Sequence, residues 1–518
     1  MLCDKVNKVS ILNMIPYIVV LLSPFIACVI FFIYNGSSLF CYDAFNTAIN
    51  DELGYYHNIR MIRDWWTPEG YTGYNEVLPA LHGYGPYTVF TYMPYVALSF
   101  LTGINSHNFV MYCNLIMILL SLIILVRFSA INIPQSIAIS VFLSTFLVMD
   151  YYIFSGMTEA AHVAFMVAVF GIMIRLYKQQ DDLQPRKESA MIWSTTVLII
   201  IFGIIRPYEL TLLALPLIYV LKTKEKKSMC RYAIISSFLA VFVVLLYFYL
   251  TNNYCSPYFK QLGLGNQIIE LIKHGQFFEI IGKIIQTNIN SLNYLGLIKT
   301  ANWTSAVLII FLSFQVISLA ITIIDIKKKK CNLLSVLGMI MLLISFLIYE
   351  SNIILYSAWN LGRTLLSITV IMGLLLCIRM RACYRLIPVV PTISVMLAIM
   401  MIGTNLFILP QVSEQYQDVD DDVLREEFER IMPMSENSWD QTIAFEVQYS
   451  GMYIMFLLPS YLGLQCCEQS IITEKISDHS LQSKYVLTKS IGSVYTVCQN
   501  AGLTELWTDG TWCIWSIR

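Results

Sequence analysis

Two acidic residues stand side by side after the first long apolar run of the sequence. They are Asp51 and Glu52, and Tyr55 and Arg60 follow them in the same polar stretch. Carboxylates are costly close to hydrocarbon, so a membrane protein that keeps them at a membrane surface usually employs them in function. Asp51 and Glu52 are therefore candidate catalytic residues, provided that the rest of the chain places them outside the bilayer near a cationic partner.

The composition indicates a membrane protein. The chain has 518 residues, of which 57% are hydrophobic and 13% charged. The charged fraction is about half of that in a soluble domain. The net charge of −1 gives no reason to expect a nucleic acid as partner.

The basic residues predict the topology of the spans. Lysines and arginines cluster between the apolar runs, and such clusters remain on the cytoplasmic side. With every cluster inside, eleven runs alternate across the membrane, at about 11–33, 108–126, 131–149, 157–177, 190–205, 208–221, 232–250, 304–324, 332–349, 362–378 and 386–409. The apolar stretch Pro86 to Leu101 then has no place as a span. Its tyrosines and prolines are typical of an interfacial segment that does not cross.

This topology places the polar segments on the extracytoplasmic side. Residues 1–409 form the membrane domain, with a first outer loop at 35–107 and a middle outer loop at 251–303. Arg206 and Arg363 each stand at an outer boundary of a span, where a guanidinium can bind phosphate in bidentate geometry. The alternative is that both side chains reach to lipid headgroups.

Residues 410–518 are predicted to form a small soluble α+β domain outside the membrane, called the tail below. It begins with an acidic amphipathic helix, Asp418 to Met432. Strands are expected at about 442–447, 452–457, 483–488, 493–497 and 510–517. Four cysteines lie in the tail, so a disulfide is possible, although their spacing does not choose a pair. No zinc-ligand spacing is present.

The order of these features resembles the C-type membrane glycosyltransferases, a superfamily that includes protein O-mannosyltransferases and the aminoarabinose transferase of lipid A. Their first outer loop commonly reads Asp-Glu-x-x-Tyr, which Asp51, Glu52 and Tyr55 match. Ser155 to Glu159 opens a span at a place where relatives often have an acidic residue. Gly362 to Leu366 is similar to the arginine-bearing start of a late span. The resemblance covers about residues 11–409.

The resemblance implies an all-α polytopic membrane protein with about 11 transmembrane helices and interfacial helices in the first outer loop. It implies inverting transfer of a sugar from a polyprenyl-phosphate carrier to a glycan, lipid or protein acceptor on the outer face of the cell membrane. The carrier phosphate is a good leaving group, so it requires a cation rather than a general acid. Asp51 is the expected base, with Glu52 as alternative or orienting partner. Asp43 is a further candidate for the base. Tyr55, Glu159, Arg206 and Arg363 are the expected substrate-binding residues.

Two other function classes remain open. A polysaccharide polymerase or ligase of the cell envelope would also be a multispan protein with large outer loops, but it would not need Asp51. A transporter or flippase would carry charges in mid-span or an inverted repeat. The mid-span positions here are nearly free of charge. The sugar, the acceptor and any need for a divalent cation do not follow from the sequence.

Overall fold

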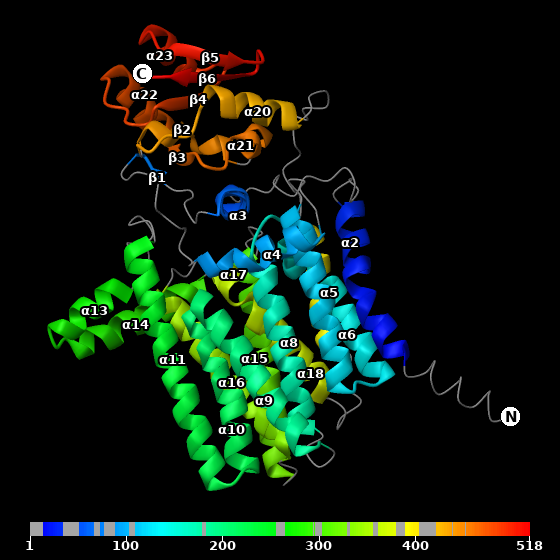
Figure 1. Cartoon of the computed structure of the whole chain (residues 1–518). Coiled ribbons are helices and arrows are strands. Elements are labelled where there is room, and N and C mark those ends of the chain that lie inside the picture. The colour runs from blue at the N-terminus through cyan, green and yellow to red at the C-terminus, as the bar shows by residue number, and fades with distance from the viewer. Residues whose placement is uncertain are drawn as a thin grey trace.

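The computed structural model shows a long helical bundle with a small sheet domain at one end (Figure 1). The bundle holds the predicted membrane domain, and the sheet domain is the tail. The structure describes residues 14–34, 51–66, 73–76, 89–102, 109–178, 183–254, 265–293, 295, 303–328, 332–355, 361–379, 389–403, 421–437, 439–450 and 452–517.

Seven helices among these residues are long and apolar enough to cross a membrane. The first is Met14–Ile33, whose second part is α2 (Ser23–Tyr34). The other six are α5 (Phe109–Ser129), α8 (Glu159–Lys178), α9 (Pro185–Ile205), α11 (Lys226–Tyr254), α15 (Trp303–Lys327) and α16 (Leu333–Leu355). Each agrees with one of the predicted spans.

The other four predicted spans are bent, broken or short. The run at 131–149 forms α6 (Ile133–Thr145) and α7 (Leu147–Ile153), which are bent by 67° at Phe146. The run at 208–221 is a 3-10 helix, η3 (Pro207–Leu213), followed by α10 (Ala214–Thr223). The last two are the shorter helices α18 (Leu366–Arg379), preceded by α17 (Leu361–Thr364), and α19 (Val389–Gly403). By helix length the described residues therefore give seven spans, or eight with the bent pair, and the eleven remain a prediction.

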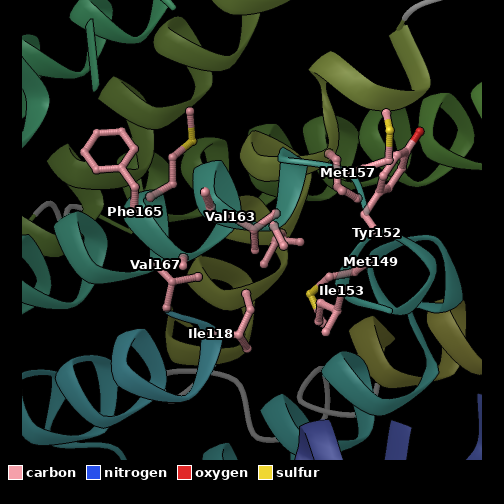
Figure 2. Close-up of a cluster of buried hydrophobic side chains, with 14 of the residues drawn as sticks. Ile118, Met149, Tyr152, Ile153, Met157, Val163, Phe165 and Val167 are labelled. Atoms are coloured by element: carbon pink, nitrogen blue, oxygen red, sulfur yellow. The ribbon is translucent and has the colours of Figure 1, made fainter. Parts of the chain in front are cut away.

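One part of the buried core of the bundle lies between α5, α7 and α8. Ile118, Met149, Val163 and Val167 come from these three helices and surround one small enclosed space (Figure 2). Gly171 of α8 lies so close to the backbone of α5 that a Cβ there would come within 2.8 Å of the Leu125 Cα atom. A small residue at such a crossing allows two apolar helices to approach closely.

Short helices lie at the tail end of the bundle. The first outer loop contributes α3 (Asp51–Trp65), η1 (Val89–Thr91) and α4 (Met93–Thr102). Figure 1 shows α3 between the bundle and the tail, with α4 and α17 beneath it. With ten residues α4 is too short to span a bilayer. The middle outer loop contributes α13 (Gly265–Lys273) and α14 (Phe277–Asn293), which project from the side of the bundle.

The sheet has six strands in the order β1-β3-β2-β4-β6-β5, of which β1 (Gly73–Tyr74) comes from the first outer loop and the other five from the tail. Strands β1, β3, β2 and β4 are parallel, and β6 and β5 continue antiparallel. The strands of the tail sequence are β2 (Thr442–Glu446), β3 (Gly463–Cys467), β4 (Tyr485–Lys489), β5 (Thr504–Thr508) and β6 (Trp512–Ser516). Its helices are α20 (Asp421–Ile431), η8 (Trp439–Gln441), η9 (Val447–Tyr449), α21 (Tyr453–Leu457), α22 (Gln469–Ser477) and α23 (Ser493–Asn500). Helices alternate with the parallel strands, which is an α/β arrangement rather than the predicted α+β one.

Two predicted strands of the tail are wrong. The segment at 493–497 belongs to helix α23, whose buried Val494 and Cys498 have the four-residue spacing of a helix face. The segment at 452–457 forms α21, where four consecutive apolar residues are buried. It therefore lacks the alternation of buried and exposed side chains that a half-buried strand would show. The acidic helix and the strands near 442, 485 and 512 are confirmed. The disulfide that the sequence allowed in the tail is not present, because Cys466, Cys467, Cys498 and Cys513 are free cysteines.

The predicted topology can be tested by thiol labelling of single-cysteine variants in intact cells. We expect a membrane-impermeant reagent to modify a cysteine at Gln499, which is exposed in the tail, but not the native Cys230, which is exposed in a predicted cytoplasmic cluster. Permeabilised cells should show both modified. A cysteine at Asn105, outside the described residues, should react from outside if α4 does not cross. Protection of Asn105→Cys in intact cells would overturn the membrane map.

Candidate active site

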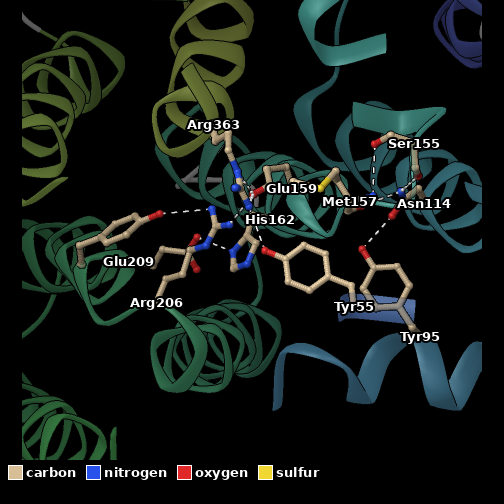
Figure 3. Close-up of polar contacts among 11 residues, drawn as sticks. Tyr55, Tyr95, Asn114, Ser155, Met157, Glu159, His162, Arg206, Glu209 and Arg363 are labelled. Carbon is tan, nitrogen blue, oxygen red and sulfur yellow. Dashed lines mark hydrogen bonds and ion pairs between the residues drawn. The ribbon is translucent and has the colours of Figure 1, made fainter. Parts of the chain in front are cut away.

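Two arginines converge on one buried carboxylate at the tail end of the bundle. Arg206 Nη2 donates to Glu159 Oε1 at 3.1 Å, and Arg363 Nε donates to the same oxygen at 3.0 Å. Arg363 Nη2 also lies 3.0 Å from this oxygen in the ion pair. Figure 3 shows the two guanidinium groups reaching Glu159 from separate helices. The structure therefore brings together three residues that the sequence identified separately.

The local sequence explains why each side chain stands there. Glu159 is in the first turn of α8, where the helix dipole favours a negative charge. Arg206 has an extended backbone and ends α9, because the following residue, Pro207, disfavours helical geometry in its neighbour. Arg363 lies in α17, the short helix that precedes α18. All three positions are ends of helices, where polar side chains can leave the apolar interior.

The first outer loop closes the cluster through α3. Tyr55 accepts a hydrogen bond at its hydroxyl from Arg363 Nη2, at 2.9 Å. Glu52 is buried, and its Oε1 accepts the backbone N–H of Gly156 at 2.9 Å. Asp51 is the first residue of α3, but its side chain lies outside the described part of the structure. Asp43 lies outside the described residues altogether.

A second layer of polar residues holds the turn that precedes α8. Asn114 of α5 is buried and donates to the carbonyls of Ser155 and Met157, at 3.2 and 3.0 Å. The hydroxyl of Tyr95 in α4 donates to Asn114 at 2.7 Å. This turn presents the Gly156 N–H to Glu52, so Asn114 supports the turn to which α3 is bonded.

The sequence prediction missed a buried pair beside Arg206. His162 Nδ1 and Glu209 Oε1 lie 2.7 Å apart, and both side chains are almost completely buried. His162 follows Glu159 by three residues, which places the two on one face of α8. A histidine inside an apolar span was a usable signal, since ionisable residues there are usually functional. Oε2 of Glu159 and Oε2 of Glu209 have no hydrogen-bond partner among the described residues.

No group of three or more His, Cys, Asp or Glu side chains with the geometry of a metal site occurs among the described residues. The cluster itself can bind an anion at its arginines and can hold Tyr55 and the start of α3 in place.

Comparison with known proteins gives structural matches alone. No protein-family model and no curated protein matches the sequence. Among solved structures, the fold is similar to ArnT from Cupriavidus metallidurans in the apo state, with 11% identity and a TM-score of 0.45, and bound to undecaprenyl phosphate, with 10% and 0.46. Both matches cover 96% of this chain and 97% of that chain.

A second similar structure is the archaeal oligosaccharyltransferase AglB from Archaeoglobus fulgidus in complex with an inhibitory peptide and a dolichol-phosphate. It has 10% identity and a TM-score of 0.45, with 96% of this chain and 74% of that chain covered. Likeness of this degree assigns no role to any residue, so the roles rest on the contacts of this chain.

Proposed function

We propose that this protein transfers a sugar, with inversion, from a polyprenyl-phosphate carrier to a glycan, lipid or protein acceptor on the outer face of the membrane. The observation that carries the proposal is the convergence of Arg206 and Arg363 on Glu159, next to Tyr55 of the first outer loop. Buried charges at the ends of apolar helices are expensive, and they normally mark a functional site.

Arg363 is the better placed of the two arginines to meet the donor phosphate. Its side chain is 15% exposed, whereas that of Arg206 is 1% exposed. The ion pair with Glu159 and the bond to Tyr55 fix the plane of its guanidinium group, and a fixed plane favours bidentate binding of phosphate. Arg206 then has an indirect role: it orients Glu159, which in turn orients Arg363.

The leaving carrier phosphate requires stabilisation of negative charge, which Arg363 provides. The acceptor hydroxyl requires a base. Asp51 is the proposed base, because Glu52 is buried and already accepts the Gly156 N–H. Glu52 therefore has the orienting role, holding the start of α3 against the turn that precedes α8. Direct attack by the acceptor, opposite the leaving phosphate, inverts the anomeric centre.

The proposal predicts that Glu159→Gln strongly reduces transfer. The amide keeps the shape of the side chain but removes the negative charge that holds both guanidinium groups, so Arg363 should lose its orientation. We expect at least about a tenfold loss, since hydrogen bonds to charged groups contribute roughly 1.5–3 kcal/mol each. The measurement is release of undecaprenyl phosphate from undecaprenyl-phosphate sugars in membranes with matched protein levels.

Glu188→Gln is the matched control for this test. Glu188 is also buried and paired with a cation, Lys224, but it lies near the other end of α9. The helical rise of 1.5 Å per residue puts it about 27 Å from Arg206. This variant should retain transfer. Equal activity of Glu159→Gln and Glu188→Gln would remove the arginine cluster from the reaction.

A further inference from the structure

The first outer loop supplies a strand to the sheet of the tail. Strand β1 (Gly73–Tyr74) lies in this loop, nearly 400 residues before its partner, and pairs in parallel with β3. Gly73 is opposite Gln465 and Tyr74 opposite Cys466. A Cβ at position 73 would overlap the end of the buried Gln465 side chain, so a larger residue there would require that side chain to move.

The two residues that directly follow β1, Asn75 and Glu76, hold the strand in place through hydrogen bonds. Asn75 donates its N–H to the Cys466 carbonyl at 2.9 Å, and its Oδ1 accepts the N–H of Glu468 at 2.8 Å. Glu76 is buried, and its two carboxylate oxygens accept the N–H groups of Gln482 and Ser483, at 2.9 and 2.6 Å.

The backbone at Asn75 and Glu76 is strained, which indicates that the surrounding contacts impose this conformation. Asn75 and Glu76 both have positive φ, of 53° and 54°. Two consecutive non-glycine residues in this region are unusual and persist only where surrounding contacts impose them. Lys475 adds to those contacts, donating to the Asn75 carbonyl at 3.1 Å and lying 3.5 Å from the Glu76 carboxylate.

Helix α3 leads into this strand and lies between the tail and the bundle. On its tail side His57 Nε2 is 3.2 Å from the Met455 carbonyl, and Trp65 Nε1 donates to Ser460 at 3.1 Å. Burial lowers the pKa of His57 to about 4, so the ring is neutral in this contact. On its bundle side α3 carries Glu52 and Tyr55, which bind Gly156 and Arg363.

We propose that the tail is a positioning element of the active site, and that β1, Asn75 and Glu76 form a latch that holds α3 against the bundle. The expected effect of the latch on the rate of transfer rests on the proposed function, since α3 carries the base and its orienting partner. A displacement of about 1 Å at a reacting group can cost roughly 100-fold in rate. Asn75 and Glu76 are positioning residues, because they act on the site through α3.

A designed disulfide tests whether the latch exists in the protein. A cysteine at Tyr74 would be opposite the native Cys466 in adjacent strands, about 4.8 Å apart, which is within disulfide range. Burial raises the pKa of Cys466 to about 11, so an added oxidant is required. We expect mass spectrometry to find the peptides of residues 74 and 466 linked. The control replaces Cys466 by serine, which leaves Cys467 on the opposite face of β3 and should abolish the link.

Removal of the latch tests its consequence. Glu76→Ala leaves two N–H groups of the tail without their acceptor, and we expect kcat for transfer to fall about tenfold or more while KM for the undecaprenyl-phosphate sugar changes little. Trypsin should cleave faster after Arg60 and Arg63 of α3. Oxidation of the Tyr74→Cys, Glu76→Ala protein should restore both kcat and protection. Glu76→Gln keeps one hydrogen-bond acceptor, so it should show the same changes to a smaller extent. This variant replaces Glu76→Ala in the test if the alanine variant does not accumulate in cells.

Asp509→Ala is the matched control. Asp509 also accepts two backbone N–H groups of the tail, those of Thr511 and Trp512, but at the turn between β5 and β6. It should leave kcat and cleavage of α3 unchanged. The latch is overturned if no link forms, if both Glu76 variants keep wild-type kcat and cleavage, or if the disulfide fails to rescue. If wild-type protein transfers no sugar, the proposed function fails, and the link and the trypsin rates decide the latch alone.

Discussion

Replacing Arg363 by lysine is expected to reduce transfer from a polyprenyl-phosphate donor by roughly 10- to 100-fold, and replacing it by alanine should reduce transfer further. Lysine keeps the charge but cannot reproduce the planar group that binds Glu159 through Nε and Nη2 and Tyr55 through Nη2. The loss should occur in the use of the donor, so kcat/KM for the lipid-linked sugar is the quantity to measure, with expression and folding matched to wild type.

Arg379→Lys is the control for this effect. Arg379 ends α18, is buried, and is paired with Asp325 at 2.9 Å, so, like Arg363, it is an arginine paired with a carboxylate, but it lies at the other end of α18. We expect this variant to keep its activity towards the donor. An Arg363→Ala protein that turns over donor at the wild-type rate would exclude Arg363 from the site.

The members of the candidate site could be predicted from the sequence, but their contacts could not. Glu159, Arg206 and Arg363 are charged residues at the edges of apolar runs, and the cost of burying charge makes such positions visible in a sequence. Their meeting on one carboxylate oxygen depends on how α8, α9 and α17 are packed, over separations of 47 and 204 residues. The contact between His162 and Glu209 likewise depends on the packing of separate elements, although a histidine inside an apolar span was a usable signal by itself.

The junction between the first outer loop and the tail was beyond sequence patterns altogether. Strand β1 has two residues, which is too short to show alternation, and its partner β3 is buried at every position. Asn75 and Glu76 would be interpreted as ordinary loop residues, whereas their side chains bind the backbone of the tail. The pairing of β1 with β3, nearly 400 residues apart, is decided by tertiary structure and cannot be predicted from a local sequence pattern.

Asp51→Asn is expected to reduce transfer by about 10²- to 10⁴-fold, the contribution typical of a carboxylate that removes a proton in the transition state. Asparagine has almost the same shape and still accepts a hydrogen bond, but it is far less basic. Membrane insertion, protein level and binding of the lipid donor should therefore be unchanged. Transfer measured in membranes with matched protein levels provides the test.

The swap also separates catalysis from helix capping. Asp51 begins α3, where an aspartate can act as a helix cap, and asparagine caps a helix equally well. A purely structural Asp51 would therefore tolerate the change. Glu52→Gln should cost less than Asp51→Asn, because the amide oxygen can still accept the Gly156 N–H, and Asp43→Asn should cost less again. Full activity of Asp51→Asn with loss in Asp43→Asn would move the base to Asp43, and full activity of all three variants would refute the proposed mechanism.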